Sequence, residues 1–179
     1  MNAPINAALP QYLLLEDVPW EAYEKMSDAL SDRSVRMTYD RGALEIMVVS
    51  HQRDWVKRLV GRMIERLAEE LGQPIKSAGS TTQRRRPAAR GLEPDESYYL
   101  ANEPLVRLKD QLDFERDPPP DLVVEVDITS GALDRVGMYA AMKMPELWRY
   151  DHVNDEVLFY LLDEQGAYQR ADAAKPSRS

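Results

Sequence analysis

The sequence contains no cysteine and only two histidines among its 179 residues. Without cysteine the chain has no disulfide framework and no thiolate zinc site, which fits a reducing compartment. No apolar run approaches the roughly 18 residues of a membrane-spanning helix, and the N-terminus lacks the charged and apolar regions of a signal peptide. We therefore expect a cytoplasmic protein with no membrane partner.

The chain also lacks an excess of positive charge, because acidic residues outnumber basic ones and the formal net charge at pH 7 is −8. Proteins that hold nucleic acid over a large surface are usually basic, so this charge argues against extensive phosphate binding but allows a local basic patch. The length suits one domain with a real core. We predict a single domain over residues 1–170, with a loose lead-in over 1–10 and a disordered tail over 171–179.

Hydrophobic periodicity and turn residues divide the chain into mixed helices and strands. Helices are predicted over residues 20–30, 51–71 and 132–142. Strands are predicted over residues 35–39, 43–48, 92–100, 122–128, 147–150 and 157–161, and the first two form a β-hairpin. The mixture predicts an α/β or α+β fold whose sheet contains both pairing senses.

The helix over residues 51–71 has the clearest pattern, with Ser50 as its expected N-cap and Gly72 as its end. Apolar residues recur along it at spacings of three and four. We expect the whole stripe to face the core, and it consists of Trp55, Val56, Leu59, Val60, Met63, Ile64, Leu67 and Leu71.

The strand over residues 122–128 is almost entirely aliphatic, which is typical of a strand buried on both faces. Two carboxylates, Glu125 and Asp127, interrupt it. Because strand side chains alternate, both lie on one face together with Val123. An ionised carboxylate in a buried strand is costly unless a positive group meets it. The sequence therefore predicts a cationic side chain or a metal ion on that face.

Three acidic residues, Glu45, Asp95 and Glu125, fall within predicted strands. If the strands of Asp95 and Glu125 are neighbours, their carboxylates can converge on one hard cation. Oxygen ligands suit Mg²⁺ or Mn²⁺, and such an ion can polarise a phosphodiester and activate water. Arg135, on the following helix, is the candidate for stabilising charge on the phosphoryl group. The alternative is that each carboxylate is an ordinary salt-bridge partner.

Four ordered motifs carry a resemblance to a known family. They are Asp40-Arg-Gly-Ala-Leu-Glu45-Ile-Met, Gly91-Leu-Glu-Pro-Asp95, Pro120-Asp-Leu-Val-Val-Glu125-Val-Asp-Ile-Thr-Ser130 and Tyr139-Ala-Ala-Met-Lys-Met-Pro-Glu-Leu-Trp148-Arg-Tyr-Asp151. Between Val35 and Leu162 the chain resembles the Uma2 family, which is similar to the PD-(D/E)XK, or restriction-endonuclease-like, nucleases. The resemblance implies a mixed central β-sheet flanked by helices.

The resemblance also implies a site. Asp95 matches the aspartate of the PD motif, Glu125 matches the acid of the ExK strand, and Glu45 matches the acidic position of the first hairpin. A metal ion, Mg²⁺ or Mn²⁺, would be held by Asp95, Glu125 and the Val126 carbonyl, and Glu45 would act through metal-bound water. The implied activity is that of a divalent-metal-dependent DNA endonuclease.

One departure from the family pattern affects this reading. Asp127 stands where the ExK motif has lysine, and relatives are expected to supply that lysine from the next helix, where this chain has Arg135. Arginine keeps a positive charge but does not readily release a proton. The alternative is therefore a catalytically degenerate nuclease-fold module that binds nucleic acid or protein. A toxin-like or mobile-element accessory factor is a third reading.

Arg84, Arg85, Arg86 and Arg90 form the only dense basic run, and they are the candidates for contacting phosphate groups of DNA. A solvated loop is the alternative. His51 is an accessory candidate, because it follows the Glu45 hairpin and could approach the acidic cluster, although a capping role is also open. A homodimer is expected if both strands of a duplex are cut, and the sequence does not indicate which surface would pair.

Overall fold

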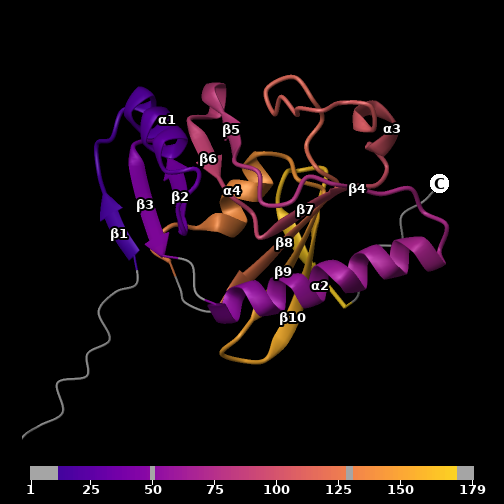
Figure 1. Cartoon of the computed structure of the whole chain (residues 1–179). Coiled ribbons are helices and arrows are strands. Elements are labelled where there is room, and N and C mark those ends of the chain that lie inside the picture. The colour runs from indigo at the N-terminus through magenta and orange to yellow at the C-terminus, as the bar shows by residue number, and fades with distance from the viewer. Residues whose placement is uncertain (1–11, 49–50, 128–130, 173–179) are drawn as a thin grey trace, which may run out of the picture.

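The computed structural model describes residues 12–48, 51–127 and 131–172, apart from the side chains of residues 51 and 52. Its helices are α1 (Trp20–Ala29), α2 (His51–Glu70), α3 (Glu103–Val106), α4 (Arg135–Ala141) and a 3₁₀ turn, η1 (Arg86–Ala88). Its strands are β1 (Tyr12–Leu15), β2 (Val35–Asp40), β3 (Ala43–Val48), β4 (Lys76–Ser77), β5 (Gln83–Arg85), β6 (Arg90–Leu92), β7 (Glu96–Tyr99), β8 (Leu122–Asp127), β9 (Glu146–Asp151), β10 (Glu156–Leu162) and β11 (Tyr168–Ala171). The fold class is α/β, as predicted (Figure 1).

The N-terminal half forms an antiparallel sheet whose described strands have the order β1-β3-β2-β6-β5. One face, including Met37 and Leu44, packs against α1. Strand β6 comes close to that helix, because a Cβ added at Gly91 would lie 2.2 Å from the Tyr23 hydroxyl oxygen. The opposite face carries polar side chains, since Arg36 pairs in register with Met47 and Thr38 with Glu45. This polar face lines the site described below.

The second sheet has the described strand order β11-β10-β9-β8-β7-β4, and only the β8–β9 pairing is parallel. Strand β8 lies near its centre. Leu122 and Val124 pack towards α2, whereas Val123 belongs to a different core cluster together with Tyr139 of α4. The predicted alternation of this strand is therefore confirmed. Figure 1 shows α2 lying across the second sheet and α4 near the junction of the two sheets.

The described strands form two sheets, whereas one central sheet was expected. The predicted strand over residues 92–100 is split, with Leu92 ending β6 in the first sheet and Glu96 beginning β7 in the second. Pro94 fits the break, because proline has no backbone N–H to donate to a neighbouring strand. Asp95 therefore lies in the connection immediately before β7, not inside a strand as predicted.

Three other boundaries differ from the prediction. Helix α4 begins at Arg135 instead of residue 132, because the Asp134 side chain caps it by accepting a hydrogen bond from the Gly137 N–H at 3.0 Å. The sequence favours Thr129 or Ser130 as the cap of this helix, and both lie outside the described residues. Tyr168–Ala171 form β11 on the edge of the second sheet, so this strand ends at the first residue of the tail predicted over 171–179, of which residues 173–179 lie outside the described range. The segment between β7 and β8, where no helix was predicted, contains α3. The lead-in over residues 1–10 lies outside the described range.

Helix α2 has almost its predicted length, but the prediction that its whole apolar stripe faces the core is wrong. Val56, Ile64 and Ala68 are buried, whereas Trp55 is 67% exposed and Met63 is 62% exposed. The eight apolar residues form two adjacent rows, and a helix resting on one face of a sheet buries only one of them. No helix in the described part of the chain is long and apolar enough to cross a membrane.

Candidate functional site

Asp95 and Glu125 meet where β7 begins beside the middle of β8, so the predicted convergence of their strands is present. The backbone N–H of Asp95 donates to the Val124 carbonyl at 3.1 Å. Its carboxylate accepts from the Val126 N–H at 2.7 Å. Asp95 is 4% exposed and Glu125 is 5% exposed. Two nearly buried carboxylates thus lie on adjacent segments and need cationic partners.

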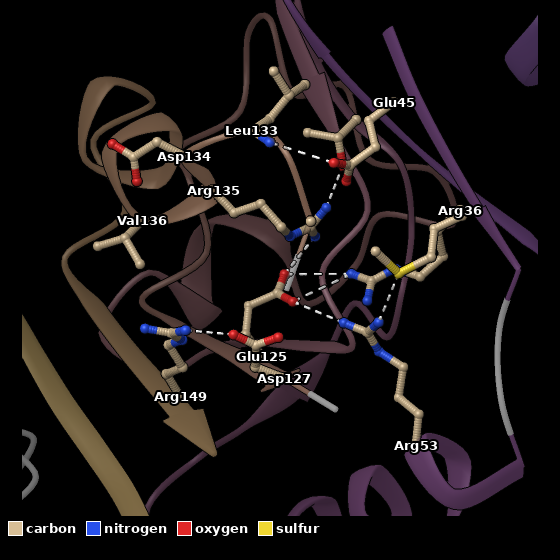
Figure 2. A pocket seen from close by; sticks show the side chains of 13 residues that line it. Arg36, Glu45, Arg53, Glu125, Asp127, Leu133, Asp134, Arg135, Val136 and Arg149 are labelled. Carbon is tan, nitrogen blue, oxygen red and sulfur yellow. Dashed lines mark hydrogen bonds and ion pairs between the residues drawn. The ribbon is translucent and has the colours of Figure 1, made fainter. Parts of the chain in front are cut away.

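Two arginine side chains bridge these carboxylates. Arg53, from the first turn of α2, places Nε 2.9 Å from Asp95 Oδ1 and Nη2 3.3 Å from Glu125 Oε2. Arg36, from β2, places Nη1 3.1 Å from Asp95 Oδ1 and Nη2 3.3 Å from Glu125 Oε1. Figure 2 shows both guanidinium groups pointing towards Glu125. Each arginine therefore occupies a position between the two acids.

A third arginine reaches Glu125 from α4. Arg135 Nη2 lies 2.6 Å from Glu125 Oε1 and 2.6 Å from the Glu93 carbonyl oxygen, and Nη1 contacts the Thr38 hydroxyl. Tyr139, one helical turn further on, donates its hydroxyl to the same Glu125 oxygen. All four carboxylate oxygens of the Asp95–Glu125 pair thus accept hydrogen bonds from the chain itself.

The negative charges of the two acids in this cluster are already matched by arginines. Burial alone would raise the pKa of Glu125, but the charges of Arg135, Arg36 and Arg53 outweigh it and lower that pKa to about 2. For Arg135, burial favours the neutral form and is outweighed by the Glu125 charge, so its pKa is raised. Burial, reinforced by the Glu125 charge, raises the pKa of Tyr139 well above its ordinary value. The cluster at neutral pH is therefore two carboxylates, three guanidinium groups and a neutral phenol.

A divalent cation does not fit this arrangement. Its place between Asp95 and Glu125 is taken by Arg36 and Arg53, and the cluster of three arginines and two acids already carries one excess positive charge. Adding two more charges in a buried setting, without releasing an arginine, is strongly unfavourable. Among the described residues, no three histidine, aspartate or glutamate side chains form a group that could hold a metal ion.

Glu45 lines the same cavity but has a different set of contacts. Its carboxylate is 1% exposed and accepts from the backbone N–H groups of Ala132 and, at 3.3 Å, Leu133. Gly131 permits this approach, because a Cβ there would lie 2.7 Å from both Glu45 carboxylate oxygens. Glu45 thus anchors the segment that leads into α4 and so helps to position Arg135.

The cavity beside the cluster has a volume of about 170 Å³. Its lining joins the polar face of the first sheet to β8 and α4, and Figure 2 shows Arg36, Glu45, Glu125 and Arg135 around it. At one side Asp127 forms an ion pair with Arg149 of the neighbouring strand. The predicted cationic partners on this face of β8 are therefore side chains.

The predicted basic run lies elsewhere, and three of its arginines contact carboxylates of the chain itself. Arg84 lies 2.7 Å from Asp28, Arg90 lies 2.9 Å from Asp40, and Arg86 forms ion pairs with Glu21 and Glu24. Arg85 is half-buried on β5. Their assignment as phosphate contacts stays a prediction. His51 is the first residue of α2, but its side chain lies outside the described part of the chain.

Sequence reasoning identified Asp95, Glu125 and Arg135 but missed Arg36, Arg53 and Tyr139. A signal for Arg36 was available, because in a hairpin it shares the polar face that carries Glu45. Arg53 lies three residues before the buried Val56, on the sheet-facing row of α2. Tyr139 follows Arg135 by four residues and therefore lies on the same side of α4.

The sequence profile of the Uma2 family, described as "Putative restriction endonuclease", matches residues 20–179. This match covers all of the site described above and both sheets except β1. A search of curated proteins gave no match. The extent of the profile match, together with the α/β fold, shows that the chain belongs to the Uma2 family of restriction-endonuclease-like proteins.

Proposed function

We propose that this chain is a nucleic-acid-binding module that uses a restriction-endonuclease-like fold without hydrolysing its ligand. The observation that carries this proposal is the occupation of the Asp95–Glu125 pair by Arg36, Arg53 and Arg135. Metal-dependent cleavage needs carboxylate oxygens that are available to the ion. In this chain those oxygens serve as acceptors for guanidinium groups, which makes the cluster a structural brace between α2, β2 and α4.

A polar groove next to this brace supports nucleic acid as the ligand. It has a volume of about 630 Å³, and it shares Arg36 and Asp95 with the acid cluster. Its walls are the segment that follows α1, the beginning of α2 and the loop before β5. The lining contributes several hydroxyl and cationic groups, namely Ser31, Ser34, Ser80, Thr81, Thr82, Arg33 and Lys57. Side chains of these types make most contacts to phosphate and sugar in protein–nucleic acid complexes.

The charge of the groove is compatible with a polyanion at one end. Arg33 is exposed there, whereas Lys57 lies 3.6 Å from Glu96 and is partly compensated. The acids of the lining are Asp54, Glu93 and Asp95; Asp95 is paired with Arg36 and Arg53, and burial raises the pKa of Glu93. Arg33 is therefore the residue of this groove on which a backbone phosphate contact depends most.

Binding and cleavage can be tested separately. Fluorescence anisotropy with labelled single-stranded and duplex DNA in EDTA should show salt-sensitive binding. Arg33→Ala should weaken binding and reduce the slope of log K against log salt by about one. Arg116→Ala is the matched control, because the Arg116 side chain is 86% exposed and forms a surface ion pair with Asp113, away from the groove. Absence of binding at low salt, or equal effects of both variants, would overturn the proposal.

The second candidate is the divalent-metal-dependent DNA endonuclease that the family description suggests. It is favoured by the pairing of Asp95 with the Glu125 strand, beside the cavity that Glu125 and Arg135 line. It requires Arg36 and Arg53 to leave the two carboxylates first. Incubating supercoiled plasmid with the wild type and Mn²⁺ distinguishes the candidates. Our proposal expects intact plasmid, whereas cleavage that disappears in Glu125→Gln would establish the endonuclease instead.

A further inference from the structure

The outward face of α2 carries a continuous row of large apolar side chains. The row consists of Trp55, Leu59, Met63 and Leu67 of α2 and of Leu71 immediately after it, each four residues from the next, and we refer to it as the outer row. Its members are between 37% and 69% exposed. Figure 1 shows α2 at the periphery of the molecule, with the second sheet on one side only. The outer row is therefore uncovered although the inner row of the same helix is well packed.

The apolar surface continues from the outer row onto the second sheet. A shallow cavity of about 620 Å³ beside α2 is lined by Leu59, Met63 and Leu67 together with Trp148 of β9. Trp148 packs edge-to-face on Phe159 of β10, at a centroid distance of 5.3 Å. Both aromatic residues are half-buried and lie on the α2 side of the sheet, since Trp148 packs against the core cluster that includes Ile64.

The size of this surface points to an interface. At roughly 200 Å² for a large side chain, the outer row alone exposes on the order of 500 Å². That is comparable to the largest apolar patch of a typical monomer, which is often functional. With the adjacent sheet face it approaches the roughly 800 Å² that each partner buries in a stable complex.

The order of residues in the outer row suits a second copy of the same helix. The row is symmetric about Met63, because Leu59 and Leu67 lie four residues to either side and Trp55 and Leu71 lie eight residues to either side. In an antiparallel pair related by a two-fold axis through Met63, each residue meets a large apolar residue of the partner. A two-fold interface requires this kind of self-complementary surface.

The charges beside the outer row favour the same antiparallel arrangement. Arg58 and Arg62 lie in the N-terminal half of α2, whereas Glu65, Glu69 and Glu70 lie in the C-terminal half. Arg66 and Asp54 are the exceptions: Arg66 is paired with Glu69 and Glu70 within its own helix, and Asp54 lies in the first turn. Antiparallel pairing places the basic half of one helix beside the acidic half of the other. Parallel pairing would bring like charges together.

We infer that the outer row of α2 is the interface of a homodimer in which two α2 helices pack antiparallel with Met63 at the two-fold axis. Arg53 lies on the buried, sheet-facing row of α2, so this pairing leaves the Asp95–Glu125 cluster uncovered. The inference does not depend on the proposed ligand, because it uses only the shape and charge of this helix face.

The absence of cysteine provides a direct test of the axis. Met63→Cys introduces a single thiol, and a thiol at a two-fold axis lies close to its own symmetry mate. Under mild oxidation, or with a short bismaleimide, we expect a covalent dimer on a non-reducing gel. Leu108→Cys is the matched control, because Leu108 is 91% exposed and lies outside α2. Equal cross-linking of the two variants would overturn the inference.

Oligomeric state tests the interface independently. By sedimentation velocity at micromolar concentration, we expect the wild type and Leu108→Glu to be dimers and Met63→Glu to be a monomer with an unchanged circular dichroism spectrum. Arg58→Glu and Glu69→Arg should each weaken the dimer, and the double variant should recover it. A monomeric wild type, or a dimer that survives Met63→Glu, would refute the interface, whatever the DNA-binding assay shows.

Discussion

Replacing Glu125 by glutamine distinguishes an arginine-braced cluster from an empty metal site. The change keeps the shape of the side chain and removes one negative charge. In an empty metal site, it relieves repulsion between carboxylates and leaves the metal-free protein equally or more stable. In the cluster described here, it leaves three buried arginines facing Asp95 alone. The two arrangements therefore predict opposite signs for the change in unfolding free energy.

The magnitude follows from the pKa of Glu125. Its drop from the ordinary value of 4.5 to about 2 corresponds to about 3 kcal/mol of stability at neutral pH, since one pKa unit is worth about 1.4 kcal/mol. Removing one member of a buried ion pair usually costs about 3–5 kcal/mol. Both approaches predict that Glu125→Gln lowers the unfolding free energy by about 3–5 kcal/mol.

Urea denaturation in EDTA at pH 7 measures this loss. With a slope of about 2 kcal/mol per molar urea, the midpoint should fall by roughly 2 M. Glu164→Gln is the control, because Glu164 is an exposed acid in the turn between β10 and β11 and should change the midpoint little. A midpoint of Glu125→Gln equal to or above that of the wild type would refute the brace and favour an open metal site.

The pH dependence gives the same experiment a second readout. The pKa of Glu125 is lowered on folding, so its contribution is fully present above pH 4.5 and is lost as the pH falls from there towards 2. Glu125→Gln lacks this titration. The difference in stability between wild type and variant should therefore shrink between pH 6 and pH 3. A difference that stays constant over this range would contradict the assigned pKa.

Three further predictions concern the brace and the core. Tyr139→Phe removes the hydroxyl that donates to Glu125 and should lower the unfolding free energy by about 1.5–3 kcal/mol in urea denaturation. Gly91→Ala places a methyl group 2.2 Å from the Tyr23 hydroxyl oxygen, so it should cost about 1–3 kcal/mol and alter the near-ultraviolet circular dichroism of the aromatic cluster. Saturating Mn²⁺ should shift the wild-type Tm by less than about 1 °C, whereas a specific site filled at a hundredfold its Kd would add about 2.7 kcal/mol and several degrees.

The elements with one dominant physical signal could be predicted from the sequence. The hairpin of β2 and β3 follows from alternation around a glycine turn, and the faces of β8 follow from the two-residue period of a strand. That period also required a positive group opposite Glu125. The division into two sheets was not predictable in the same way. The chain leaves β6 of the first sheet and enters β7 of the second within residues 93–95, and local sequence patterns do not show that these two strands belong to different sheets.

The composition of the site was harder to predict than its position. Each acid was found from its own strand, but the partners that decide their chemistry come from distant elements: Arg36 lies on β2 and Arg53 on α2. Whether an arginine on a helix reaches a carboxylate on another element depends on tertiary packing, which sequence spacing does not encode. The same limitation explains the error on α2, where spacing identified apolar residues but not which row the sheet covers.

The balance of charge around Asp95 and Glu125, more than the identity of the two acids, determines what they can bind. A nuclease centre needs carboxylates whose negative charge is left for an ion to neutralise. Here Arg36 and Arg53 reach these two acids from β2 and α2, and Arg135 replaces the expected lysine on α4. A lysine at residue 135 would supply a single point charge, whereas arginine also holds the Glu93 carbonyl and Thr38 and so closes the cluster from a third side. Arg135 on α4, together with Arg36 and Arg53, therefore favours a cluster held by ion pairs over a vacant cation site.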